Sequence, residues 1–116
     1  MSSQFKTGTV EGTGSAINVE IGFQPDRVVL YNIDDAGSLS PRLEWNVGMG
    51  DDAGWKMLTI ADNGTDGVNS SEHITSDGVS QYAGSQAANS EGFTIGADSD
   101  INASGETIVW EAYRAD

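Results

Sequence analysis

The sequence predicts an all-β protein, a single-domain antiparallel β-sandwich or jelly-roll-like barrel with an extended N-terminal arm. Short runs of β-branched and aromatic residues recur at intervals of roughly 8 to 12 residues, which is typical of such folds. Turns rich in Gly, Asn, Asp and Ser separate these runs. No window keeps an apolar period of 3.6 residues, so no long helix is expected. A chain of 116 residues fits one domain.

Residues 1–14 carry several glycines among Ser and Thr, with weak alternation from Phe5 to Glu11. This composition predicts an N-terminal arm or an edge strand. Residues 15–116 then form the single β-sandwich domain. An extended arm is suited to adding a strand to the exposed sheet edge of another protein.

The first half of the domain contains four predicted strands. Alternation of apolar and polar residues at 17–21 places one face on a core. Residues 27–33 are nearly all β-formers and predict a central strand covered on both faces. Residues 42–47 alternate again, with Leu43, Trp45 and Val47 on one face. A Gly-rich connection then leads to a partner strand at 55–60.

The second half is less regular. Residues 61–91 are dominated by Asn, Gly, Ser, Asp and Thr, and predict short strands near 73–75 and 79–82 with a helical turn between 81 and 89. Residues 92–114 read as a strand, a tight polar loop and a strand. In that loop, Asp and Asn side chains can bond their own backbone in Asx-turns.

The net charge is strongly negative, since 18 acidic residues stand against 5 basic ones to give −13. Such a field repels nucleic acid and anionic lipid, so neither nucleic acid nor a membrane is an expected partner. The sequence has no cysteine, which excludes disulfides and thiolate zinc sites. It also shows no signal peptide or membrane-spanning stretch, so a soluble cytosolic product is expected.

No residue pattern indicates catalysis or a cofactor. Asp98, Asp100 and Asn102 begin like a calcium-binding loop, but Ala103 and Val109 replace the required Gly and Glu, so turn formation is the better interpretation. His73 is the only histidine, and the sequence contains no Gly-x-Ser-x-Gly motif whose serine this histidine could activate as a general base. We therefore expect no catalytic, cofactor or metal residues, and no enzyme activity.

The three tryptophans lie on predicted strands, where core packing is the default interpretation. A sugar-stacking platform is the alternative. Trp55, next to the acidic turn of Asp51 and Asp52, is the best candidate for it.

Two stretches resemble structural proteins of tailed bacteriophages. Residues 92–96 (GFTIG), 100–107 (DINASGET) and 110–113 (WEAY) resemble the ending found in that group. Residues 22–29 (GFQPDRVV) resemble a strand entry of the same group, and the order of the two stretches matches. Many proteins with this ending are longer tail or fibre components, whereas a stand-alone acidic β domain looks more like a head decoration, or cement, protein.

The resemblance implies a protein made in the host cytoplasm and placed on the outside of the virion capsid. Its expected partners are the major capsid protein and itself, as a small homo-oligomer such as a trimer. The expected contacts come from the arm and from loops 34–41 and 62–71: Phe5, Lys6, Asp34, Asp35, Leu39, Asn63 and Asp66. The alternative is a tail-associated receptor- or carbohydrate-binding module that uses Trp55, Asp51 and Asp52.

Overall fold

The computed structural model describes residues 4–34, 40–60 and 68–115. These residues form an all-β structure with one short 3₁₀ helix and no α-helix. None of the described helical segments is long or apolar enough to cross a membrane. The elements are β1 (Gln4–Glu11), β2 (Ile17–Glu20), β3 (Arg27–Asn32), β4 (Arg42–Asn46), η1 (Val47–Met49), β5 (Ala53–Ile60), β6 (Val68–Tyr82), β7 (Gly92–Ile95) and β8 (Thr107–Arg114).

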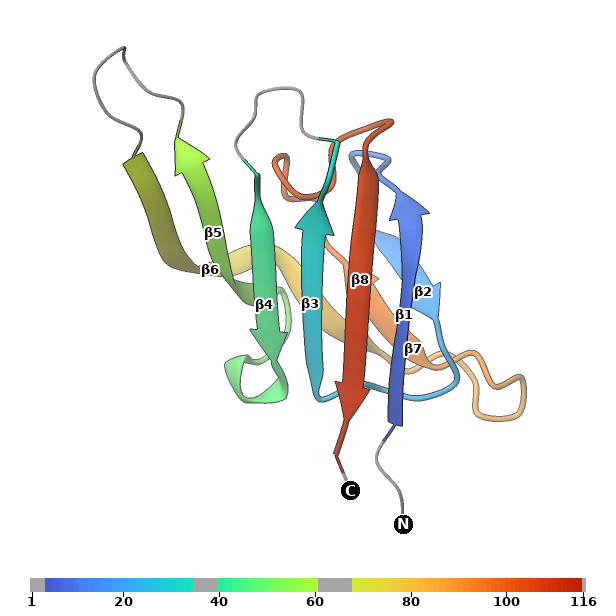
Figure 1. The fold of residues 1–116 in the computed structure, drawn as a ribbon. Helices are drawn as coiled ribbons and strands as arrows, with labels where there is room; N and C mark the ends of the chain where they lie inside the picture. Colours follow the sequence, from blue (N-terminus) through green and yellow to red (C-terminus); the bar gives the residue numbers. More distant parts are fainter. Residues whose placement is uncertain (1–3, 35–39, 61–67, 116) are drawn as a thin grey trace.

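All eight strands belong to one antiparallel sheet with the order β1-β8-β3-β4-β5-β6-β7-β2. The sheet curls into a half-barrel, so that β7 and β2 lie behind β8 and β1 in Figure 1. β1 and β2 follow each other in the chain but occupy the two ends of the sheet. The half-barrel is therefore open between these two edge strands.

The core lies on the concave side of the sheet. Each strand places alternate side chains there, as period-two alternation requires. Phe93 of β7 packs edge-on against Trp110 of β8, with ring centroids 5.5 Å apart. Because β7 and β8 are distant in the strand order, this contact joins the two ends of the sheet across the core. The buried apolar cluster consists of Ile21, Phe23, Val28, Leu30, Leu43, Trp45, Ala53, Val79, Phe93, Ile95, Ile101, Ile108, Trp110 and Ala112.

β6 is one strand of 15 residues, so the prediction of two separate short strands was wrong. Its first part pairs with β5, and residues 79–82 pair with β7. The ladder shifts between Ala53 and Gly54, where four residues of β6 have no partner on β5. Asp77 in this bulge has a φ of 61°. The bulge bends β6 and turns the sheet back on itself, which alternation alone does not predict.

Three further expectations differ from the structure. Val47 was expected on the buried face, but the strand ends at Asn46 and Val47 is 45% exposed in η1. The helical turn expected within residues 81–89 is a hydrogen-bonded turn in which Asn89 N–H donates to Gln86 O. Residues 4–11 are not an extended arm but the edge strand that was the alternative for residues 1–14, because β1 pairs with β8 along its whole length at one end of the sheet. Residues 1–3 lie outside the described residues.

Candidate functional site

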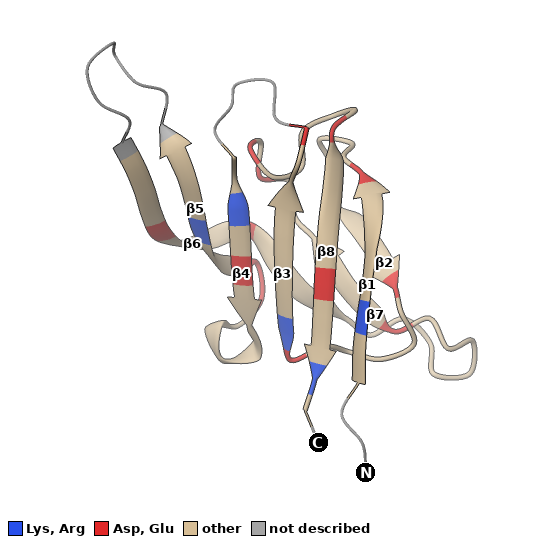
Figure 2. Cartoon of the chain, viewed as in Figure 1, with Lys and Arg blue, Asp and Glu red and all other residues tan. Residues whose placement is uncertain are grey.

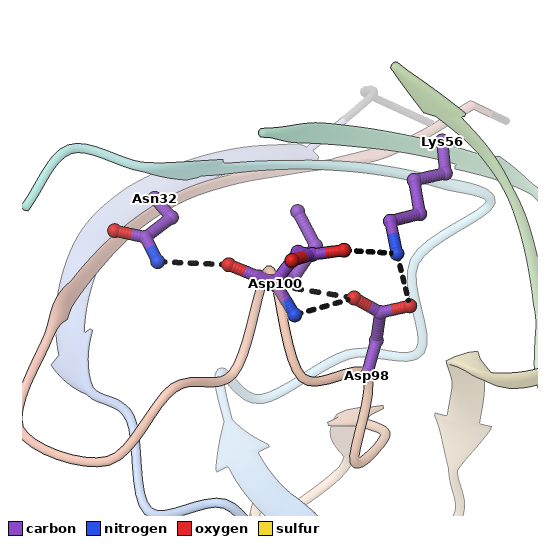
Figure 3. A network of polar contacts seen from close by, with 5 residues as sticks. Asn32, Lys56, Asp98 and Asp100 are labelled. Carbon is purple, nitrogen blue, oxygen red and sulfur yellow. Dashed lines mark hydrogen bonds and ion pairs between the residues drawn. The ribbon is translucent and has the colours of Figure 1, made fainter. Parts of the chain in front are cut away.

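The loop between β7 and β8 is held by an ion-pair network on the inner side of the sheet (Figure 3). Lys56 of β5 pairs with Leu43 of β4, so its side chain faces inward. Its Nζ lies 2.9 Å from Asp98 Oδ2 and 2.7 Å from Asp100 Oδ2. The Lys56 side chain is only 12% exposed. Burial lowers the pKa of Lys56, but the hydrogen bonds and charges of Asp100 and Asp98 outweigh this and raise it overall.

Asp98 forms the Asx-turn expected from its position. Its Oδ1 accepts hydrogen bonds from the backbone N–H groups of Asp100 at 3.0 Å and Ile101 at 3.1 Å. The carboxylates of Asp98 and Asp100 are thus engaged by Lys56 and by the loop backbone. Within residues 4–34, 40–60 and 68–115, no group of three or more His, Asp or Glu side chains is arranged to hold a metal ion.

Two buried asparagines complete the loop. Asn32 donates to Asp100 O at 2.9 Å and to Glu106 Oε1 at 2.8 Å. The side chain of Asn102 is fully buried and makes four hydrogen bonds. Its Nδ2 donates to Ser15 O and Gly96 O, and its Oδ1 accepts from the N–H groups of Thr13 and Gly14. These bonds join the loop to the link between β1 and β2.

The outer face of the sheet, opposite the core, carries the second notable cluster. Residues that are paired across neighbouring strands lie on the same face of a sheet. The pairing of β1, β8, β3, β4, β5 and β6 therefore brings their outward-facing side chains together on this surface. We call the following residues the outer face cluster: Phe5, Arg27, Tyr31, Arg42, Trp55, His73 and Tyr113.

Polar and ring contacts fix the side chains of this cluster. Arg42 pairs with Glu44 and lies over the Tyr31 ring, with its Cζ 5.4 Å from the ring centroid. Arg27 lies 3.4 Å from Glu44. Tyr113 donates from its hydroxyl to Glu111 at 2.9 Å, and this bond raises the pKa of Tyr113. An aromatic surface is thereby held in a defined geometry, with its two arginines accompanied by Glu44 and Glu111 on the same face.

Trp55 is the exposed tryptophan, at 42%, whereas Trp45 and Trp110 are buried. Its Nε1 donates to Ser71 Oγ at 2.6 Å, and its ring stacks at 12° to His73 with centroids 6.5 Å apart. Asp51 and Asp52 are exposed in the turn before β5, but Asp52 bonds Ser80. The structure therefore brings Ser71 and His73, and not the two acids, to Trp55.

Phe5 and Lys6 lie on opposite faces of β1. Phe5 is 53% exposed and packs on Tyr113, with ring centroids 4.8 Å apart. Lys6 faces the inner side, and its Nζ donates to Ile21 O at 2.7 Å, across the opening between the two edge strands.

Asp34 is the first residue of loop 34–41, which is expected to contact the coat. It is exposed, and its Oδ2 accepts from Thr107 N–H at 3.1 Å. This hydrogen bonding lowers the pKa of Asp34. The other expected contacts in loops 34–41 and 62–71, namely Asp35, Leu39, Asn63 and Asp66, lie outside the described residues.

Sequence reasoning missed the polar residues that organise these sites. Lys56 stands in a strand of mostly apolar residues, and its place among the inward-facing positions is the only signal of its role. The sequence predicts Asn102 only as a turn residue, whereas its buried side chain donates to Ser15 O, 87 positions away in the chain. Tyr31 and Arg42 come together only because β3 pairs with β4.

No family model matches the sequence, and searches of curated proteins and of solved structures also found no match.

Proposed function

We propose that this protein is a non-enzymatic virion protein of a tailed bacteriophage that decorates the capsid exterior and stabilises it by bridging coat subunits. The observation that carries the proposal is the outer face cluster. Trp, Tyr and Arg are the residue types enriched at the energetic centres of protein interfaces. Here they lie on the outer face of the curled sheet, with their side chains already held by neighbours, so docking costs little side-chain entropy.

The rest of the described surface supports the same proposal. Acidic residues are spread over the loops, the strand ends and parts of β4 and β8 in Figure 2. A protein with this charge can cover a shell at high density without binding nucleic acid. Many weak contacts repeated over a lattice add by avidity, so each contact can be modest. As part of this proposal, the two ends of the curled sheet act as the two layers of a β-sandwich. The Phe93–Trp110 contact across the core supports this.

Co-sedimentation with undecorated capsids, scored by cryo-electron microscopy, tests the proposal. We expect stoichiometric density on the outer shell, with the outer face cluster against the coat. Trp55→Ala and Phe5→Ala should each weaken binding by roughly tenfold or more, because exposed aromatic anchors dominate such interfaces. Ser99→Ala, in an exposed position of the loop after β7, is the matched control. Absence of capsid density would count against decoration.

The second candidate is a tail-associated module that binds a carbohydrate. The observation that favours it is the exposed indole of Trp55, whose Nε1 is anchored on Ser71. Ser71 also lines a surface depression of about 310 Å³ whose other lining residues include Arg42, Met57, Thr59 and Asn69. An aromatic ring beside hydroxyl, amide and guanidinium groups is chemistry suited to a sugar. A glycan array with no hit at high micromolar protein would remove this candidate.

A further inference from the structure

We propose that β1 pairs with β1 of a second copy of this chain, antiparallel about a two-fold axis near the middle of the strand. The two sheets would then form one continuous sheet across the dimer. This names an interface for the small homo-oligomer that the resemblance implies, and it goes beyond the proposed function. The test uses the isolated protein, so its failure is distinguishable from failure of capsid binding.

The first argument is the state of the β1 backbone. Gly12 N–H donates to Glu106 O at 2.8 Å, in line with the register in which Glu11 pairs with Thr107. Because antiparallel bonding alternates, the even-numbered residues of β1 face β8. The backbone groups of Phe5, Thr7 and Thr9 point to the other side. Among the described residues, no strand pairs with that side.

The edge also lacks the features that natural proteins use to block pairing. β1 is eight residues long and contains neither proline nor a register shift. Its only lysine, Lys6, faces inward to Ile21 O and does not guard the edge. The other edge strand, β2, is only four residues long and carries this lysine contact just beyond its end. Of the two edge strands, β1 is therefore the one better suited to pair with a further strand.

The distribution of charged residues along β1 favours a second copy of this chain as the partner of the free edge. The end of β1 near Gln4 lies beside Arg114 and near Lys6 and Arg27, and the blue segments in Figure 2 gather at this end of β1, β3 and β8. The acidic residues at this end are Asp26, which precedes Arg27, and Glu20 and Glu91, which lie on either side of the Ile21 backbone that Lys6 contacts. The opposite end carries the acidic residues Glu11, Asp34 and Glu106, whereas Asp98 and Asp100 are already paired with Lys56.

A two-fold antiparallel pair places the basic end of each copy against the acidic end of the other, and does so twice. A parallel pair would instead align like charges. β1 itself contributes one Lys and one Glu, so the strand is locally neutral in a chain of net charge −13. Pairing would also cover part of Phe5, which is 53% exposed and sits next to the edge on the outer face.

Sedimentation velocity over a concentration series tests the pairing. Wild type should approach twice the 12.2 kDa chain mass at about 100 µM. Thr9→Pro removes an N–H that points away from β8, and edge positions tolerate proline. It should weaken association by roughly tenfold or more. Thr9→Val keeps the N–H and is the matched control, with association like that of wild type.

A second measurement does not depend on a variant. Hydrogen exchange by NMR should show the amides of Thr7 and Thr9 becoming protected as the concentration of wild type rises, while those of Lys6 and Val10 are protected throughout. A wild-type protein that stays monomeric up to about 1 mM would overturn the proposal. A dimer whose Thr7 and Thr9 amides exchange rapidly would also overturn it, because its interface would lie elsewhere.

Discussion

Lys56 and Asp98 are 42 positions apart in the chain, yet the lysine ammonium lies 2.9 Å from the aspartate carboxylate on the inner side of the sheet. Both side chains are only 12% exposed. The pair fastens the β7–β8 loop to the middle of β5. The loop contributes the buried residues Ile101 and Asn102 to one end of the half-barrel. The Lys56–Asp98 pair therefore ties this end of the core to β5.

Replacing Lys56 with Met should destabilise the fold by about 2 kcal/mol, because Asp98 and Asp100 are left close together without a counter-charge in a partly buried site. Urea unfolding followed by tryptophan fluorescence measures the change. The triple variant Lys56→Met, Asp98→Asn, Asp100→Asn removes the charges together and should recover part of the loss. If Lys56→Met unfolds at the same urea concentration as wild type, the ion pairs do not hold the loop.

The stability contributed by Lys56 should depend on pH only in the alkaline range. The pKa of Lys56 is raised in the folded state, so the contribution is complete below the unfolded pKa of about 10.4 and is lost as pH rises through the higher folded pKa. The difference in unfolding free energy between wild type and Lys56→Met should therefore be constant from pH 7 to 9 and shrink above about pH 10.4. Tyrosine titration is common to both proteins and cancels. A difference that shrinks below pH 9 would contradict the assignment.

The all-β class and most strand positions could be predicted from the sequence, because each strand carries its own local signal. Alternation placed Leu43 and Trp45 on one face, and both are buried. The three tryptophans could not be separated in this way. Trp45 and Trp55 both lie on strands next to glycine-rich turns, and only the sheet register decides that Trp45 faces the core and Trp55 faces outward.

The candidate sites were less predictable because they are made by pairing between distant strands. Trp55 was assigned to a platform with Asp51 and Asp52 on proximity in sequence, yet its ring lies beside His73 across the β5–β6 ladder. Arg42 and Tyr31 meet for the same reason. A one-dimensional pattern gives the face of each residue within its strand, but not the register that brings two strands together.

The bulge in β6 predicts a strong effect at Gly78. A Cβ added there would lie 2.1 Å from the Ala53 carbonyl oxygen, which is backbone and cannot move aside without breaking the bend. Gly78→Ala should cost about 2 to 3 kcal/mol, in the range of overpacked core positions. Thermal unfolding by circular dichroism measures it. Gly48→Ala, where the nearest atom to the new Cβ is 3.5 Å away, should be close to neutral, and equal losses in the two variants would refute the role of the bulge.

Asn102 offers the sharpest test of how the loop is closed. Asn102→Asp keeps the shape of the side chain but replaces the donating amide with a second acceptor, so Ser15 O and Gly96 O lose their bonds while a charge enters a fully buried site. The loss should be about 3 kcal/mol or more at pH 7. It should become smaller as pH falls, because a protonated carboxyl can donate one of the two bonds. Ser99→Ala, an exposed position in the same loop, should stay within about 0.5 kcal/mol of wild type. Chemical unfolding of the three proteins at pH 7 and pH 4 would decide the matter, since a pH-independent loss in Asn102→Asp would mean that shape and not hydrogen bonding fixes this residue.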